Sequence, residues 1–335
     1  MTLPIFRWSR NLTLLVAVLG LLYAIVQKRT PLGSIGSSGS LQSFKTMFIS
    51  IVLEALPFIL LGVVLSALLQ VFVPEAWIRR LIPRNPLLGI VVACVIGIIF
   101  PVCECGMIPV VRRLIQKGMP VYAAVVFILT GPIINPVVYA ATYMAFRSDP
   151  AIAYARMGLA FAVAAVVGLL VYRTVRRNPL RHSAAGLTGE GAEAHSHSGG
   201  KLAAMFTHAA EEFFEMGKYL IAGALLAALM QTFVARESLV AVGQSGLLSH
   251  LFMMGFAYVL SLCSTSDAFV ASSFTGLFTK GSLLTFLVFG PMLDMKSTLM
   301  LLSVFKTRFV LLLALLIAVS VPAGALLLEH FQLIR

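Results

Sequence analysis

The segment FPVCECGMIPVVRRLIQKGMP, at residues 100–120, decides how this chain folds. It follows a long apolar run and sets Cys103, Glu104 and Cys105 between two prolines. Proline interrupts a helix, and non-helical backbone at membrane depth is tolerated only where protein covers it or where it lines a wet cavity. The segment therefore predicts a broken helix whose break faces a site inside a helical bundle.

The composition of the chain indicates a membrane protein. Of its 335 residues, 59% are hydrophobic and only 11% are charged, against about 25% charged residues in soluble domains. Long apolar runs recur from end to end, which predicts an all-α polytopic membrane protein. The net charge of +12 fits basic cytoplasmic loops beside anionic lipid. No basic patch alternates with aromatic residues, so nucleic-acid binding is not expected.

Two apolar runs are too short to cross a bilayer. Residues 87–101 extend about 22 Å at 1.5 Å per residue, against a hydrocarbon core of roughly 30 Å, and residues 247–263 are similar. Each run is followed by a polar break and a second half-length run, at 107–117 and 268–279. We expect two re-entrant hairpins, because this topology places nearly all basic clusters on one face and the N-terminus in the cytoplasm.

The two halves of the chain resemble each other. LEALPFILLGVVLSALLQVFV (53–73) aligns with FEMGKYLIAGALLAALMQTFV (214–234), and GPIIN (131–135) aligns with GPMLD (290–294). We expect both Gly-Pro pairs to interrupt a span at mid-depth. Three full spans and one hairpin in each copy make an odd number of crossings, so the two copies are predicted to be inverted repeats.

This reading divides the chain into four parts. They are an N-terminal anchor helix at 1–30, transmembrane repeat 1 at 46–173, a Gly/Ser/His-rich cytoplasmic linker at 174–205 and transmembrane repeat 2 at 206–328. Three histidines in the linker are too loosely spaced to indicate a metal site. The chain also lacks G-x-S-x-G, a Walker lysine loop and H-E-x-x-H, so neither an enzyme nor a resident cofactor or metal is predicted.

Cysteines gather at the predicted breaks. Cys103 and Cys105 lie in the first break, and Cys263 falls at the matching place in the second. Three neighbouring thiols suit a soft, thiophilic solute rather than Mg²⁺ or Ca²⁺. A single buried cysteine is more often a small packing residue, and Cys94 is interpreted in this way.

Acidic residues within apolar helices are costly and are functional candidates. Glu54 and Asp267 are our main candidates for carrying a coupling proton, with Glu104 beside them. The run STSD before Ala268 also fits the N-cap of a half-helix, and the sequence leaves both roles of Asp267 open. Asp294 and Lys296 are two residues apart and are not expected to face each other on a continuous helix.

Four motifs are similar to those of the ArsP-type permeases, the YraQ group of predicted permeases. They are PVCECGMIPVVRRLIQKGMP, TGPIINP, CSTSDAFVASSF and VFGPMLDMK. The resemblance covers residues 45–325 and implies a multi-pass inner-membrane permease, in a family with members that export trivalent arsenicals. The family motif is nearer PVCSCG, whereas this chain has Glu104 between its two cysteines, which changes the charge of the site.

Together these observations predict export of a small thiophilic solute, such as a trivalent organoarsenical, by alternating access. We expect the solute to exchange ligands with the thiols of Cys103, Cys105 and Cys263. The remaining cavity residues are predicted to be Glu104, Asn135, Ser264, Thr265 and Asp294. Two alternatives stay open at this point, namely a transmembrane thiol–disulfide relay and a passive channel for another small solute.

Overall fold

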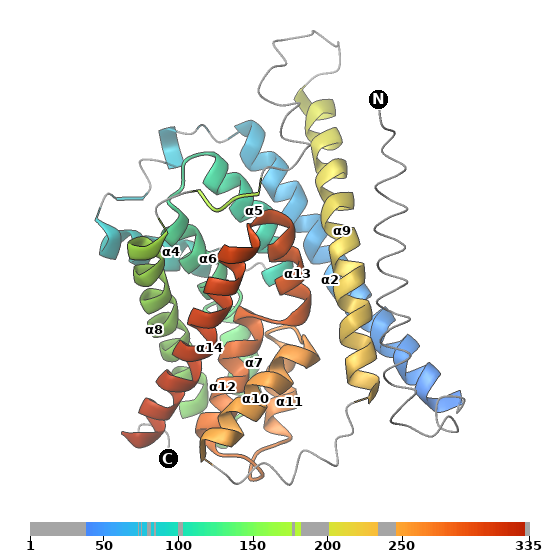
Figure 1. Cartoon of the computed structure of the whole chain (residues 1–335), viewed down its shortest axis with the longest axis vertical. Helices are drawn as coiled ribbons and strands as arrows, with labels where there is room; N and C mark the ends of the chain where they lie inside the picture. The colour runs from blue at the N-terminus through green and yellow to red at the C-terminus, as the bar shows by residue number, and fades with distance from the viewer. Residues whose placement is uncertain are drawn as a thin grey trace. The chain divides into compact units, whose positions relative to one another are not determined.

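The computed structural model describes residues 38–72, 74, 76–78, 82–83, 85–99, 103–175, 178–181, 201–233 and 246–331 (Figure 1). The predicted anchor helix and most of the predicted linker lie outside these residues. The chain divides into two compact units, residues 1–47 and residues 48–335. Of the first unit, only residues 38–47 are described, as the start of helix α2.

The described residues form twelve helices and no sheet, with two isolated β-bridges. In chain order the helices are α2 (Ser38–Phe72), α4 (Pro86–Ile99), α5 (Glu104–Gln116), α6 (Val121–Thr130), α7 (Pro136–Ala145), α8 (Ala151–Thr174), α9 (Lys201–Phe233), α10 (Gly246–Leu260), α11 (Ser266–Ser272), α12 (Lys280–Met292), α13 (Met295–Val304) and α14 (Thr307–His330). The all-α class predicted from the composition is therefore confirmed.

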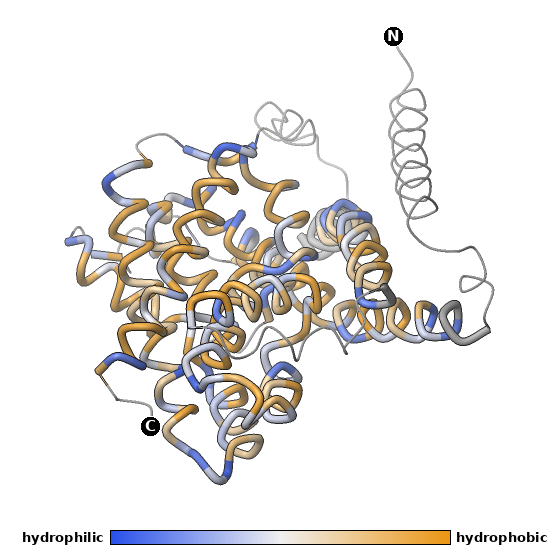
Figure 2. The backbone as a smooth tube through the Cα atoms, turned by 60° about the horizontal axis from the view of Figure 1, so that its bottom comes forward, coloured by the Kyte–Doolittle hydropathy of each residue, from blue (hydrophilic) through white to orange (hydrophobic). Residues whose placement is uncertain are grey.

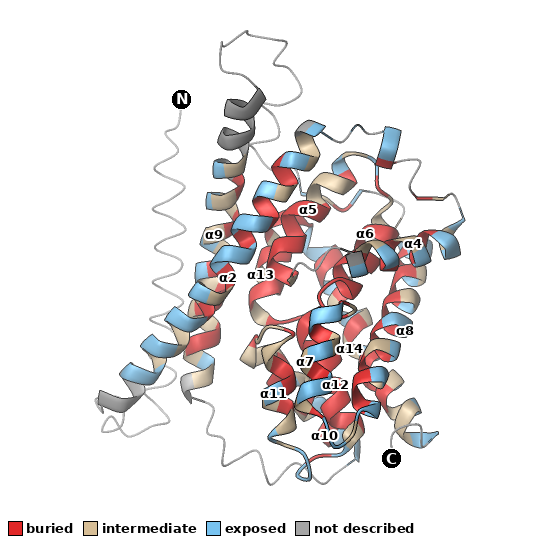
Figure 3. Cartoon of the chain, turned by 180° about the vertical axis from the view of Figure 1, so that it is seen from behind, coloured by how far each residue is buried: buried red, intermediate tan, exposed pale blue. Residues whose placement is uncertain are grey.

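Five described segments are long and apolar enough to cross a membrane: Gln42–Gln70, Ala151–Thr174, Glu212–Gln231, Lys280–Val304 and Thr307–His330. Figure 2 shows that apolar residues recur along the helices of the described chain. Large apolar side chains are exposed along α2, α8 and α14, as expected of surfaces that face lipid. By contrast, α5, α6 and α12 are buried almost throughout, which Figure 3 shows in red. The protein is thus a multi-pass membrane protein with a buried inner layer.

Helices α4 and α5 form a hairpin. A Cβ atom added at Gly89, near the start of α4, would lie 2.3 Å from the Tyr122 hydroxyl at the start of α6. One added at Gly97, near the end of α4, would lie 2.9 Å from Thr130 Oγ1 at the end of α6. Helices α4 and α6 therefore run side by side in the same direction, and α5 must return between the end of one and the start of the other.

The second half of the chain repeats this arrangement. The His250 ring near the start of α10 lies 2.7 Å from Thr285 Oγ1 near the start of α12. A Cβ atom at Gly290, near the end of α12, would lie 3.5 Å from the Ala257 side chain, near the end of α10. The chain therefore returns through α11 and the turn that follows it, where Phe278 stacks on a ring of α10.

The two spans that contain Gly-Pro pairs are both broken, but at different points. Helix α6 ends at Thr130, directly before Gly131-Pro132, as expected. Helix α12 continues through Gly290-Pro291 and ends at Met292, three residues later than an end directly before this pair. Pro291 has no N–H to donate to the Leu287 carbonyl, but the Leu293 N–H still donates to the Phe289 carbonyl at 2.9 Å, so the helix extends past the proline.

Candidate functional site

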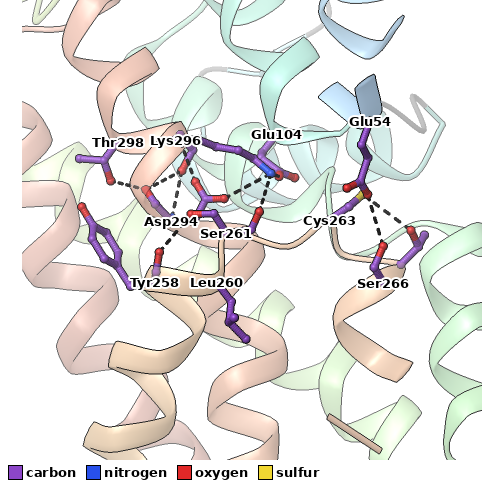
Figure 4. Close-up of polar contacts among 12 residues, drawn as sticks. Glu54, Glu104, Tyr258, Leu260, Ser261, Cys263, Ser266, Asp294, Lys296 and Thr298 are labelled. Atoms are coloured by element: carbon purple, nitrogen blue, oxygen red, sulfur yellow. Dashed lines mark hydrogen bonds and ion pairs between the residues drawn. The ribbon is translucent and has the colours of Figure 1, made fainter. Parts of the chain in front are cut away.

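The helix breaks of both halves contribute to one buried group of charges, shown in Figure 4. Lys296, in the first turn of α13, places its Nζ atom 3.2 Å from Glu104 Oε1 and 3.5 Å from Asp294 Oδ2. The same ammonium group donates a hydrogen bond of 2.9 Å to the carbonyl oxygen of Ser261. We call Glu104, Asp294 and Lys296 the charge cluster. It joins α5 of the first half to α13 of the second.

The charge cluster is deeply buried and contains more acidic than basic groups. Glu104 and Lys296 are each only 4% exposed, and Asp294 is fully buried. With both carboxylates ionised, two negative charges face one positive charge. Glu104 Oε2 and Asp294 Oδ2 are buried and accept no hydrogen bond. Buried charges normally have both an ionic partner and hydrogen bonds, so this cluster is incompletely satisfied.

The break before α13 explains why Asp294 and Lys296 face the same place. Asp294 is the N-cap of α13 and adopts an extended backbone conformation, with φ −125° and ψ 176°. Its Oδ1 atom accepts a 2.6 Å hydrogen bond from the Ser297 backbone N–H, and the Ser297 hydroxyl accepts from the Asp294 N–H at 3.0 Å. The expectation for a continuous helix does not apply to Asp294 and Lys296, because α13 begins only after Asp294.

The carbonyl group that binds Lys296 belongs to a residue in an uncommon conformation. Ser261 follows the end of α10 and has φ 47°, in the left-handed region that favours glycine. Its N–H donates to the Ala257 carbonyl, and its hydroxyl donates to the Tyr258 carbonyl. This turn directs the Ser261 carbonyl oxygen to the ammonium group, so a strained residue lies at the edge of the charge cluster.

Three thiols lie around the charge cluster. Cys103 is the N-cap of α5, and its thiol and the Cys105 thiol interact through a hydrogen bond. Cys105 is buried, whereas Cys103 and Cys263 are partly exposed, and all three are free thiols. Cys105 and Cys263 are close enough to Lys296 to interact with it electrostatically. The structure thus brings the three predicted cysteines to the same neighbourhood.

The fourth cysteine lies apart from this group. Cys94 is buried in α4 and interacts with the hydroxyl of Thr130. That hydroxyl donates its own hydrogen to the Val126 carbonyl at 2.8 Å. These contacts agree with the packing role predicted for Cys94.

Asp267 is paired with an arginine that the sequence reasoning missed. Arg156 on α8 is completely buried, and its Nη2 atom lies 2.7 Å from Asp267 Oδ2. The guanidinium group also donates to Thr142 Oγ1 at 2.8 Å and to the Ser264 carbonyl at 3.1 Å. The signal was present in the sequence, because an arginine inside an apolar span is as costly as an acid there.

The other predicted cavity residues have local partners. Asn135 caps α7, since its Oδ1 atom accepts from the Val138 N–H at 2.9 Å and its Nδ2 atom donates to the Gly131 carbonyl at 3.1 Å. Thr265 is the N-cap of α11 without a capping hydrogen bond from its side chain, and its hydroxyl lies 3.7 Å from Cys263 Sγ. Within the described residues, no group of three or more His, Cys, Asp or Glu side chains could hold a metal ion.

Glu54 is the one predicted acid of the site that comes from α2. The Ser266 hydroxyl donates to Glu54 Oε1 at 3.3 Å, and Figure 4 shows Cys263 beside this pair. The Glu54 side chain is only partly buried. It therefore lies at the edge of the site, whereas the charge cluster lies deeper.

Known proteins resemble this chain over most of its length. A family model named ArsP_1, described as "Predicted permease", matches residues 40–330. UPF0718 protein YcgR of Bacillus subtilis (strain 168) is 47% identical over 293 residues, which make up 88% of this chain and 99% of that protein. UPF0718 protein YraQ of Escherichia coli (strain K12) is 24% identical over 119 residues, or 36% of this chain and 34% of that protein.

A third relative comes from Streptococcus mutans serotype c (strain ATCC 700610 / UA159). It is named "Putative two-component membrane permease complex subunit" and is 38% identical over 265 residues, which cover 79% of this chain and 88% of that protein. No solved structure matches this chain.

Proposed function

This chain belongs to the ArsP_1 family of predicted permeases, and we infer that it exports a small thiophilic solute, a trivalent organoarsenical in particular, from the bacterial cytoplasm. The observation that carries this proposal is the gathering of Cys103, Cys105 and Cys263 around a buried charge cluster where broken helices meet. Soft thiol ligands favour soft solutes. Broken helices at the centre of a membrane bundle are the usual position of a transported solute.

The proposed chemistry is ligand exchange at arsenic. A monosubstituted arsenical with two hydroxyl groups forms two As–S bonds with two cysteine thiols. Each thiol proton leaves with one hydroxide as water, so two water molecules are released and no electron is transferred. Release on the other side of the membrane reverses the exchange. Because Cys103 and Cys105 are in contact, they are the natural first pair, and Cys263 in the other half can take over one As–S bond.

Alternating access fits an arrangement of two inverted repeats. In this proposal α2 and α4–α8 form the first repeat, and α9–α14 form the second. Two close contacts support opposite directions for the paired helices. Near the end of α2, the Ser66 hydroxyl donates a 2.9 Å hydrogen bond to Glu212, which lies in the first half of α9. Late in α14, a Cβ atom at Gly324 would lie 2.5 Å from Leu159, early in α8.

The positions of basic residues support a cytoplasmic face for one end of the bundle. Lys117, at the C-cap of α5, donates to the Gln70 carbonyl near the end of α2 at 2.9 Å. The start of the predicted linker pairs with the segment before α14, through the Arg181 N–H and the Val304 carbonyl at 2.8 Å. Both contacts agree with the topology in which these basic segments lie inside the cell.

A coupling proton is the proposed source of energy. Glu54 and Asp267 are the carriers favoured by the sequence, and both lie beside the break that contains Cys263.

A second subunit is also compatible with the family, because the Streptococcus mutans relative is named as a subunit of a two-component permease complex. We extend that name to this chain only as a proposal.

The test is uptake of methylarsenite into everted membrane vesicles. We expect wild-type vesicles to accumulate it, an uncoupler to abolish the accumulation, and Cys103→Ser or Cys105→Ser to abolish it with folded protein present. Cys94→Ala is the matched control and should transport normally, since Cys94 only packs against α6. Normal transport in both break variants would rule out the thiol mechanism.

The same experiment separates the rival functions. A thiol–disulfide relay would show a disulfide between Cys103 or Cys105 and Cys263 after exposure to an oxidised thiol partner, and no accumulation of solute. A passive channel would equilibrate methylarsenite without concentrating it, and an uncoupler would have no effect. Either result would replace the proposed exporter.

A further inference from the structure

We propose that Glu104 is the proton-binding residue of this permease and that Lys296 and Asp294 hold it in a state that takes up and releases one proton. The proposal rests on the proposed function, because it names the residue at which the coupling proton is carried. It differs from the sequence-based choice of Glu54 or Asp267.

The charge balance requires a proton. The cluster contains two carboxylates and one ammonium group, all at least 96% buried. One negative charge would remain without a counter-ion if both acids were ionised. Burying an isolated carboxylate is so costly that such a group normally binds a proton instead. One bound proton makes the cluster neutral.

The hydrogen bonds indicate which of the two acids takes this proton. Asp294 Oδ1 accepts a short bond of 2.6 Å from a backbone N–H as the cap of α13, and such a bond stabilises the ionised form. Glu104 Oε2 and Asp294 Oδ2 are both buried and accept no hydrogen bond, so the capping bond to Asp294 Oδ1 is what distinguishes the two acids. Glu104 therefore binds the proton, while Asp294 keeps its capping bond to α13 and its contact with Lys296.

The surrounding groups agree with this assignment. The ionisable groups that interact electrostatically with Glu104 are Cys105 on its own helix, Lys296 and Asp294 at the start of α13, Cys263 before α11 and Asp267 in α11. Asp267 is already neutralised by Arg156 at 2.7 Å. Glu54 is partly exposed and lies at the edge of the site, where it contacts the Ser266 hydroxyl. Glu104 is deeply buried beside a second carboxylate, Asp294, with which it shares the single ammonium group of Lys296.

The position of Glu104 also links the proton to the solute. It lies between Cys103 and Cys105, the first proposed pair of arsenic ligands. When Glu104 binds a proton, its attraction for Lys296 weakens, and the ammonium group keeps Asp294 and the Ser261 carbonyl as partners. When the proton leaves, the contact between α5 and α13 tightens again. Proton binding therefore acts on a contact between the two halves of the chain.

Infrared spectroscopy of the purified full-length protein tests this proposal without any solute. A protonated carboxylic acid that is shielded from water has a characteristic C=O stretching band, which shifts in D₂O. We expect wild-type protein to show this band and to lose it as the pH is raised. Glu104→Gln should remove the band, and Glu54→Gln, the matched control at the edge of the site, should retain it.

A second variant covers the case in which Glu104→Gln does not fold. Lys296→Met removes the ammonium group, so both acids then lack a counter-ion and the carboxylic-acid band should grow. Persistence of the wild-type band in Glu104→Gln, its loss in Glu54→Gln or its absence from wild type at every pH would overturn the proposal. Because no arsenical is involved, a failure to transport methylarsenite would disprove only the proposed substrate.

Discussion

Replacing Arg156 with methionine tests how the buried ion pair between α8 and α11 supports the fold. Methionine fills much of the same volume but leaves Asp267 without its positive partner. The Ser264 carbonyl loses its 3.1 Å hydrogen bond as well, whereas the Thr142 hydroxyl still donates to the Val138 carbonyl. Removing one member of a buried ion pair typically costs about 3–5 kcal/mol, and the lost carbonyl bond adds to this.

We therefore expect Arg156→Met to lower the free energy of unfolding by about 4 kcal/mol, or roughly 1,000-fold in the equilibrium constant. The measurement is a titration of the purified protein from mild detergent into dodecyl sulfate, followed by circular dichroism. The control is Lys280→Ala, which removes an ion pair to Asp149 whose side chains are 38% and 24% exposed. A pair with this exposure contributes less than about 1 kcal/mol.

The double variant Arg156→Met, Asp267→Asn gives the decisive comparison. Removing both charges leaves no uncompensated ion, so the double variant should regain more than half of the stability lost in Arg156→Met. Equal losses in Arg156→Met and Lys280→Ala would refute the reasoning that burial makes the first pair costly to break. A double variant as unstable as the sum of its single changes would refute the pairing itself.

Two backbone features give further predictions, each measured by the same detergent titration. Gly62→Ala should destabilise the protein by about 1–3 kcal/mol, because its Cβ atom would lie 2.3 Å from the Gly106 carbonyl oxygen of α5. Gly158→Ala is the control, because its Cβ atom would meet nothing within 4 Å. It should leave the stability unchanged or raise the free energy of unfolding by up to about 1 kcal/mol. Equal losses of stability in the two variants would contradict the close approach of α2 and α5. Ser261→Gly should stabilise the turn by about 1 kcal/mol by relieving φ 47°, and a loss of stability would show that the hydroxyl bond outweighs the strain.

The helices were largely predictable because their ends are marked by local signals. Run length and polar breaks placed the first hairpin at 87–101 and 107–117, and the structure has α4 at Pro86–Ile99 and α5 at Glu104–Gln116. The break after α12 was misplaced by three residues, because a proline in the last turn of a helix does not by itself end it. A helix end that depends on such fine backbone preferences needs the structure.

The site was predictable in its residue types but not in its partners. The cysteines and acids stood out because they are polar residues in apolar surroundings. The partner of Asp267 is Arg156, which is 111 residues away in the sequence, and no local pattern links them. The pairing of Lys296 with Glu104 likewise depends on the packing of α5 against α13. Tertiary contacts of this kind bring together the ionic partners that a single sequence leaves separate.

One difference between the two proposed repeats accounts for the excess charge of the site. Glu104 and Asp267 both lie in the first turn after a break, and each pairs with a base from the opposite half, Lys296 and Arg156 respectively. At the next break, the cap is neutral Asn135 in GPIIN but acidic Asp294 in GPMLD. Two neutral ion pairs would hold the halves together without binding a proton. The acid at position 294 adds the negative charge that makes Glu104 the site of proton exchange.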